Sequence, residues 1–196
     1  LLGSIPSSWI AGRASGVDLT RRGSGNLGGT NVFRVLGWKW ALPVVLVDVG
    51  KGFVPAWYFA GLDPVGAPEL ALAYGLAAVA GHVWSAFLRF RGGKGVATAG
   101  GVLLALAPVA AAVGVLIWVS LVFLTRIVSV ASLSAATALP VVAWVLDAQP
   151  EKVVFTVGLA AFVWWTHREN VARLARGEEL QFGAGEEAEA VEPEKS

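Results

Sequence analysis

Three short polar segments of a mostly apolar chain carry side chains that can bind anions and move a proton. The first is GSGNLGGTNVFR, residues 23–34. Its glycines allow consecutive backbone N–H groups to converge on one anion, and an arginine can hold a phosphate with two donors. We therefore expect a phosphate cradle here, with a flexible glycine-rich loop as the simpler alternative. The candidate ligands are Ser24, Gly25, Asn26, Gly28, Gly29, Thr30, Asn31 and Arg34.

The second segment is RFRGGKGVAT, residues 89–98. It lacks the nucleotide-binding P-loop pattern, because Leu88 and Gly95 stand where that pattern needs glycine and serine or threonine. What remains is a glycine turn that opens a helix near Val96, with Lys94 beside the helix N-terminus. The helix dipole and the Lys94 ammonium group would attract the same anion. An equally good interpretation of the segment is a basic flank of a membrane span without a binding role. The candidate ligands are Gly92, Gly93, Lys94 and Gly95.

The third segment is THRENVARL, residues 166–174. On a helix, His167 and Asn170 lie three residues apart and share one face. A histidine with a near-neutral pKa can accept a proton from an attacking hydroxyl group, although an interfacial histidine more often has a structural hydrogen bond. We also expect Glu169 and Arg173, four residues apart, to form a surface ion pair.

A few polar residues interrupt the apolar runs. Asp48 and Lys51 are costly in lipid unless they pair, so a structural ion pair is favoured over a substrate role. Arg126, Ser129 and Ser132 recur every three residues, which could bring Arg126 and Ser132 to a shared cavity, although serine in a membrane helix commonly serves packing. Two isolated histidines and no cysteine make a poor ligand set, so no metal or other cofactor is expected.

The composition indicates a single all-α polytopic membrane domain. The 196-residue chain is 56% hydrophobic and only 15% charged, whereas ordinary soluble domains are about 25% charged. The absence of cysteine excludes disulfides, thiol nucleophiles and cysteine-bound metals. No nucleic-acid partner is expected.

The apolar runs predict about seven membrane segments. We interpret residues 1–10, too short to span a bilayer, as the second half of a truncated first helix. The long run 96–124 would be about 43 Å as one helix, so we expect it to break near Pro108. The other runs cover residues 41–60, 70–90, 127–146 and 153–166.

The break near Pro108 also satisfies the positive-inside rule, because thirteen of the fifteen lysines and arginines then lie on one face. We therefore expect the three polar segments to meet at the cytoplasmic face, where the carboxyl terminus also lies. Residues 1–176 form the expected catalytic domain. Residues 177–196 hold seven glutamates and one lysine and are expected to be a largely disordered tail.

Several motifs together resemble the acyl-phosphate:glycerol-3-phosphate acyltransferases of bacterial membranes, the PlsY family. They are GSIPSSW, RRGSGNLGGTNVFRVLG, DVGKG, GHVWSAFLRFRGGKGVAT, RIVSVAS and HRENVARLARGEE, in that order between residues 3 and 179. The resemblance implies seven membrane helices in the bacterial inner membrane. It also implies an acyl phosphate donor, glycerol 3-phosphate as acceptor, and lysophosphatidic acid and phosphate as products. An upstream enzyme that forms the acyl phosphate is an implied partner, beside the lipid bilayer.

The resemblance also implies roles for particular residues. The first segment, Ser24 to Thr30 with Asn31 and Arg34, is similar to the donor-phosphate cradle and part of the acceptor site. Lys94, Ser132, His167 and Asn170 are similar to the residues that hold glycerol 3-phosphate, and they are the expected catalytic group. Two positions depart from the family pattern: Gly29 replaces a usual alanine, and Ser85 a usual proline.

The residue inventory fits this chemistry. An acyl phosphate already has a good leaving group, so anion binding and alignment matter more than a strong nucleophile. We expect direct transfer without an acyl-enzyme, with His167 orienting or deprotonating the glycerol hydroxyl group; alternatively, the donor phosphate takes the proton. A transporter for a phosphorylated solute is the leading non-enzymatic alternative, although transport predicts polar sites near the membrane midplane. A structural membrane subunit without catalytic activity is the third interpretation.

Overall fold

The computed structural model describes residues 1–62, 68–146 and 149–182, and every regular element within these ranges is helical. Four helices there are long and apolar enough to cross a membrane: Trp38–Leu62, Glu69–Leu88, Pro108–Thr125 and Val128–Leu146. In hydrocarbon a backbone must satisfy its own hydrogen bonds, which a helix does within one segment. The chain is therefore an all-α membrane protein, as its composition predicts.

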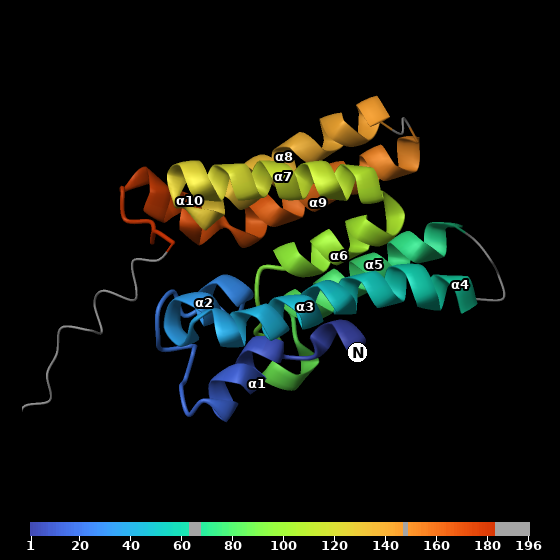
Figure 1. Ribbon diagram of the computed structural model, residues 1–196. Coiled ribbons are helices and arrows are strands. Elements are labelled where there is room, and N and C mark those ends of the chain that lie inside the picture. The colour runs from blue at the N-terminus through green and yellow to red at the C-terminus, as the bar shows by residue number, and fades with distance from the viewer. Residues whose placement is uncertain (63–67, 147–148, 183–196) are drawn as a thin grey trace, which may run out of the picture.

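The N-terminal stretch differs from the predicted single helix. A 3-10 turn covers Leu2–Ser4, and helix α1 covers Ser7–Ala14 (Figure 1). Ile5 between them is extended, with φ −54° and ψ 118°. The cause is Pro6, because a proline disfavours the helical conformation of the residue before it.

The first half of the chain continues with α2 (Gly29–Leu36), α3 (Trp38–Val54), a π-helical turn (Pro55–Phe59), α4 (Ala60–Leu62) and α5 (Pro68–Val83). A short 3-10 turn, Ala86–Leu88, leads to the second polar segment. Helix α3 packs along α6 (Val96–Leu106), and glycines let the two backbones approach closely. A Cβ at Gly52 of α3 would lie 2.0 Å from the Thr98 backbone oxygen, and one at Gly101 of α6 would lie 2.0 Å from the Val49 backbone oxygen.

The predicted break in the long apolar run is confirmed. Helix α6 covers Val96–Leu106 and α7 covers Pro108–Thr125, with Ala107 between them in a non-helical conformation. Pro108 begins α7, a position where its missing N–H costs no helical hydrogen bond. Helix α6 is shorter than the four long helices, as the length of the run to Pro108 requires.

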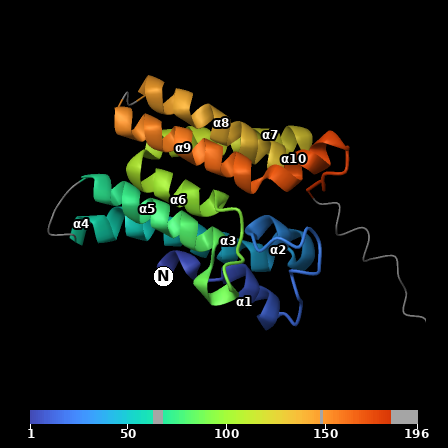
Figure 2. The same cartoon turned by 180° about the vertical axis from the view of Figure 1, so that it is seen from behind.

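The second half adds α8 (Val128–Leu146), α9 (Pro150–Thr166) and α10 (Arg168–Ala175). Helices α7, α8 and α9 form one layer, and α3, α5 and α6 form the other, as both views show (Figures 1 and 2). Helices α2 and α10 lie at the same end of the molecule. The three polar segments therefore come from both layers but reach one end.

The start of the predicted tail is ordered onto this end. The Phe182 ring stacks on the Phe33 ring of α2 with 4.5 Å between centroids, and the Phe182 N–H donates to the Arg126 backbone oxygen at 2.6 Å. Residues 183–196, to which most of the predicted disorder applies, lie outside the described residues.

Candidate active site

The glycine-rich segment folds around the side chain of Asn31, which is buried in the first turn of α2. Its amide nitrogen donates to the backbone oxygens of Leu19 and Arg22, at 3.2 and 3.1 Å. Its amide oxygen accepts the Ser24 N–H at 2.8 Å. Only glycine fits at position 23, since a Cβ there would lie 2.3 Å from that oxygen. Asn31 thus holds the loop in shape with both ends of its amide.

Arg34 lies on α2, one turn after the loop, and lines the same cavity as the loop. Its Nε atom is buried and has no hydrogen-bond partner among the residues that the structure describes. Burial lowers the pKa of Arg34, while the nearby Glu179 carboxylate acts against this effect. An arginine still keeps its charge at neutral pH, so a buried guanidinium with a free donor is suited to an anion.

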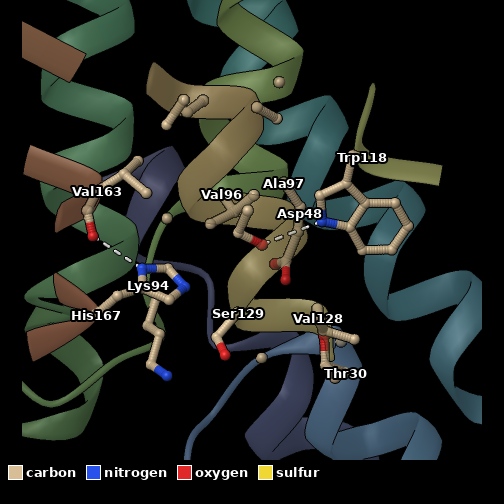
Figure 3. A pocket seen from close by; sticks show the side chains of 18 of the residues that line it. Thr30, Asp48, Lys94, Val96, Ala97, Trp118, Val128, Ser129, Val163 and His167 are labelled. Atoms are coloured by element: carbon tan, nitrogen blue, oxygen red, sulfur yellow. Dashed lines mark hydrogen bonds between the residues drawn. The ribbon is translucent and has the colours of Figure 1, made fainter. Parts of the chain in front are cut away.

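Lys94 lies just before α6, in the wall of the cavity (Figure 3). Its ammonium group donates to the side-chain oxygen of Asn170 on α10. Burial lowers the pKa of Lys94 to about 8, and the positive charge of Arg173 adds to the effect. At neutral pH the ammonium form still predominates, so Lys94 carries a positive charge in a partly desolvated place.

Gly92 and Gly93 let the Lys94 loop pack against His82 of α5. The Gly93 N–H donates to the His82 backbone oxygen at 3.2 Å. A Cβ at Gly92 would lie 1.9 Å from that oxygen, and one at Gly93 would lie 2.3 Å from His82 Nε2. The two glycines therefore fix the position of Lys94 and do not themselves line the cavity.

His167 follows the last residue of α9 and precedes α10. Its Nδ1 lies 2.8 Å from the backbone oxygen of Val163 (Figure 3). Because a carbonyl oxygen can only accept, Nδ1 carries the proton and Nε2 keeps a lone pair. Burial, followed by the charge of Lys94, lowers the pKa of His167 to about 4. The ring is therefore neutral at physiological pH, with one basic nitrogen.

Glu179, which the sequence analysis placed in the tail, joins this site. Its Oε1 accepts hydrogen bonds from Ser129 Oγ at 2.8 Å and from Asn170 Nδ2 at 2.5 Å. Its Oε2 accepts from Arg173 Nε at 2.7 Å. Burial acts to raise the pKa of Glu179, but these hydrogen bonds outweigh it and hold the pKa below its usual value. Arg173 thus pairs with Glu179, and the predicted Glu169–Arg173 pair is not observed in the described chain.

The sequence contained a signal for one of these two residues. Arg173 follows Asn170 by three residues on α10, so helical spacing places both on the face that carries His167. Glu179 follows the end of α10 and a turn at Gly177, and no spacing rule relates it to the site.

These groups line one cavity of about 400 Å³. Asn26, Lys94 and His167, from three separate segments, share its wall. Every predicted site residue except Gly25, Gly92 and Gly93 lines it. Ser129 and Ser132 of α8 line the cavity, whereas Arg126, which ends α7 and lies before α8, does not. Its deeper wall is apolar and contains Leu103, Ala111, Gly114, Leu139 and Leu159.

The predicted buried ion pair forms on the α3 side of the cavity. Lys51 Nζ lies 2.8 Å from Asp48 Oδ1, and both side chains are almost fully buried. Ser7 of α1 donates to the same carboxylate at 2.5 Å, and Lys51 donates to the Ile5 backbone oxygen at 3.0 Å. The pair therefore ties the N-terminal segment to α3, and Asp48 also borders the cavity (Figure 3).

Known acyltransferases are similar to this chain over almost its whole length. A family model described as glycerol-3-phosphate acyltransferase matches residues 1–177. The chain belongs to this acyltransferase family. A glycerol-3-phosphate acyltransferase of Desulforudis audaxviator is 42% identical, with 93% of this chain and 91% of the relative covered. One from Geobacter sulfurreducens is 41% identical, with 94% of each covered.

Solved structures of the family have the same fold. A crystal structure of PlsY, an integral membrane glycerol 3-phosphate acyltransferase in its glycerol 3-phosphate form, superposes with a TM-score of 0.88 at 37% identity, covering 96% of this chain and 94% of that one. The lysophosphatidic acid form superposes with a TM-score of 0.84, covering 93% and 91%. The chain is thus a multi-pass integral membrane acyltransferase, and the transporter and structural-subunit alternatives are set aside.

The two departures from the family pattern have local structural consequences. At Gly29, a Cβ would lie 2.4 Å from Val45 Cγ2, so alanine there would require the valine side chain to move. Ser85 is buried, and its hydroxyl group donates to the Ser4 backbone oxygen at 2.6 Å. A proline has no hydroxyl group and could not make this bond. Ser85 therefore adds a hydrogen bond that attaches the end of α5 to the N-terminal turn.

Proposed function

We propose that this acyltransferase moves a fatty acyl group from an acyl phosphate to the sn-1 hydroxyl group of glycerol 3-phosphate, giving lysophosphatidic acid and phosphate. The observation that carries the proposal is one cavity with a cationic end and an apolar end. The cationic end suits two phosphate groups, and the apolar end suits an acyl chain. The solved relatives, described in glycerol 3-phosphate and lysophosphatidic acid forms, match these ligand classes.

The charge balance of the polar end supports phosphate binding. Arg34, Lys94 and Arg173 face the cavity with three positive charges, and Glu179 contributes one negative charge. The remaining carboxylate of the wall, on Asp48, is neutralised by Lys51. Two positive charges are therefore in excess in a partly desolvated place, where they attract anions more strongly than in water.

The residues divide between two phosphate groups. Following the family resemblance, we assign the donor phosphate to the loop of Ser24 to Thr30 together with Arg34. We assign glycerol 3-phosphate to Lys94 and Ser132 with His167 and Asn170. The hydrogen bond from Lys94 to Asn170 joins the second loop to α10, so both sides of the acceptor site are held together.

The proposed reaction is direct transfer. The glycerol oxygen forms an ester bond with the acyl carbon, the bond from that carbon to the phosphate oxygen breaks, and phosphate leaves with the electron pair. Binding both substrates in one cavity supplies most of the catalysis through alignment, and the cations stabilise the charge on the leaving phosphate.

The proton of the glycerol hydroxyl group has two possible acceptors. His167 Nε2 carries a lone pair, but a pKa near 4 makes it a weak base in the protein alone. The oxygen of the leaving phosphate keeps the electron pair of the broken bond and becomes a much stronger base, which favours it as the acceptor, with His167 orienting the hydroxyl group. His167→Ala distinguishes the routes: near-normal turnover of folded variant protein would exclude a required histidine base.

The apolar depth of the cavity is the proposed place of the acyl chain. Its wall comes from α6, α7, α8 and α9. On α9, the lining residues Val163 and Leu159 are about one helical turn apart, with Leu159 farther from the polar end. Water is a competing nucleophile for an acyl phosphate. An acyl chain that fills this depth would exclude it from the reacting carbon.

The membrane setting is also part of the proposal. We place the protein in a bacterial inner membrane with seven membrane segments, the polar end of the cavity and the carboxyl terminus in the cytoplasm. The excess of basic residues on the segments that reach the polar end supports this orientation. Acyl phosphate would then be received from a cytoplasmic enzyme that forms it.

One assay tests the proposed function most directly. Purified protein is supplied with palmitoyl phosphate and labelled glycerol 3-phosphate, and labelled lysophosphatidic acid is measured, with palmitoyl-CoA as the alternative donor. We expect product from the phosphate donor only. Absence of transfer by folded protein would refute the proposal, and equal use of palmitoyl-CoA would refute the donor assignment.

A further inference from the structure

Trp118 of α7 lies in the cavity wall beside the residues assigned to glycerol 3-phosphate, and the proposed reaction gives it no part. Its indole N–H donates a hydrogen bond to Ser132 Oγ of α8, with 3.0 Å between the atoms (Figure 3). Ser132 is buried, with 4% of its surface exposed. The polar edge of the Trp118 indole is thus directed at one hydroxyl group of the site.

This bond occupies one of the hydrogen-bonding positions of the Ser132 hydroxyl group. A serine hydroxyl has one donor and two acceptor positions, and it can rotate freely about its bond to Cβ. An indole N–H can only donate, so Trp118 occupies an acceptor position of Ser132 and leaves the hydroxyl hydrogen available. Among the described residues no acceptor for that hydrogen is found. It remains available for a ligand in the cavity.

A second tryptophan on the outside of the same helix layer gives an internal comparison. Trp164 of α9 donates to Thr137 Oγ1 of α8, also at 3.0 Å. There the hydroxyl group completes its bonding within its own helix, because Thr137 donates to the Leu133 backbone oxygen at 2.8 Å. Neither Trp164 nor Thr137 lines the cavity. The same pairing of indole and hydroxyl therefore serves packing at one place and leaves a free donor at the other.

We propose that Trp118 is a positioning residue for the acyl transfer: it fixes Ser132 as a hydrogen-bond donor toward the phosphate or hydroxyl oxygens of glycerol 3-phosphate. The proposal rests on the acceptor site described under the proposed function. Without the indole N–H, the serine hydroxyl group would rotate toward a backbone oxygen of its own helix, the usual alternative for serine and threonine in membrane helices. The acceptor would then lose one oriented partner.

The test is a double-mutant cycle with a matched control. Trp118→Phe removes the N–H but keeps a large aromatic ring, Ser132→Ala removes the hydroxyl group, and the double variant removes both. Trp164→Phe removes the equivalent bond away from the cavity. For each purified protein, the KM for glycerol 3-phosphate, kcat with palmitoyl phosphate and the thermal melting temperature are measured.

We expect Trp118→Phe to raise the KM for glycerol 3-phosphate about three- to tenfold, the range of one hydrogen bond. Ser132→Ala should raise it at least as much, and the double variant should be no worse than Ser132→Ala alone, because Trp118 acts through Ser132. Trp164→Phe should lower the melting temperature about as much as Trp118→Phe and leave the KM unchanged.

Three results would overturn the inference. An unchanged KM in Trp118→Phe beside a raised KM in Ser132→Ala would show that the indole does not position the serine. Multiplying effects in the double variant would show that Trp118 acts independently. An unchanged KM in Ser132→Ala would remove the serine from the acceptor site, and with it any role for its orientation. Failure of the proposed function is seen separately, as no transfer by the wild-type protein.

Discussion

The two ends of the cavity are built in opposite ways. At the polar end, Lys94, Ser129 and Asn170 come from segments far apart in the sequence, and hydrogen bonds to one another or to Glu179 hold them together. At the apolar end, neighbouring helices supply small and aliphatic residues such as Gly114 and Leu139, which pack against each other and cannot make side-chain hydrogen bonds. Function at the polar end thus depends on individual groups, and at the apolar end on the space left free.

This difference leads to separable expectations. Changes at the polar end should alter the use of glycerol 3-phosphate whatever the acyl chain, because they remove a charge or an oriented donor. Changes at the apolar end should alter the preference among acyl phosphates and leave the acceptor largely unaffected. A variant that violated this separation would show that the two ends are coupled.

The largest effect is expected for Lys94→Met, which removes the ammonium group and keeps a side chain of similar length. We expect kcat/KM for glycerol 3-phosphate to fall about 10²- to 10³-fold, since a buried charged donor of the site is lost. The transfer assay with labelled acceptor measures this. Lys39→Met, at an exposed position at the start of α3, is the matched control and should keep near-normal activity.

The pH dependence of kcat/KM should report the titration of Lys94. With the pKa of Lys94 lowered to about 8, its charged form is lost as the pH rises through that value. We expect kcat/KM for glycerol 3-phosphate to fall about tenfold per pH unit above it. His167, with its pKa lowered to about 4, stays neutral and adds no transition between that value and neutrality. Lys94→Arg should move the alkaline decline upward, because arginine stays charged. If kcat/KM fell at the same pH in Lys94→Arg as in the wild-type protein, the decline would be caused by the titration of another group.

Glu179→Gln should have a smaller effect, because the shape is kept and only the charge is lost. The new amide group replaces one of the two carboxylate oxygens, so its N–H donors face either the Asn170 or the Arg173 donor, and we expect about a tenfold loss of kcat/KM for glycerol 3-phosphate and a lower melting temperature. Glu178→Gln is the neighbouring control, since its pair with Arg176 lies at the surface and contributes little. Equal losses in both variants would contradict a specific role for Glu179.

The smallest effect is expected at the apolar end. A Cβ at Gly114 would lie 3.2 Å from Leu139 Cδ2, so Gly114→Val would fill the deep part of the cavity. We expect the ratio of kcat/KM for octanoyl over palmitoyl phosphate to rise about three- to tenfold, with the KM for glycerol 3-phosphate unchanged. Gly158→Val, at an exposed glycine of α9 with open space beside it, is the control. An unchanged ratio would place the acyl chain elsewhere.

The sequence was most informative about local features. It predicted the helix break at Pro108 and the Asp48–Lys51 pair, because proline chemistry and the cost of a charge in lipid act over a few residues. It failed for residues 1–10, where Pro6 interrupts the expected helix. It also failed for Glu169 and Arg173, because a tertiary partner, Glu179, competes for the arginine.

By itself, then, the sequence determined that this chain forms apolar membrane helices and carries three polar segments, two suited to anions and one with a histidine suited to proton transfer. Helices arise from hydrogen bonds between near neighbours, so composition and spacing predict them. Only the tertiary structure decided which polar groups meet. Glu179 accepts a hydrogen bond from Ser129 of α8, and the Trp118 indole reaches Ser132, because the packing of the chain brings distant residues within hydrogen-bond distance. No local spacing rule contains that information.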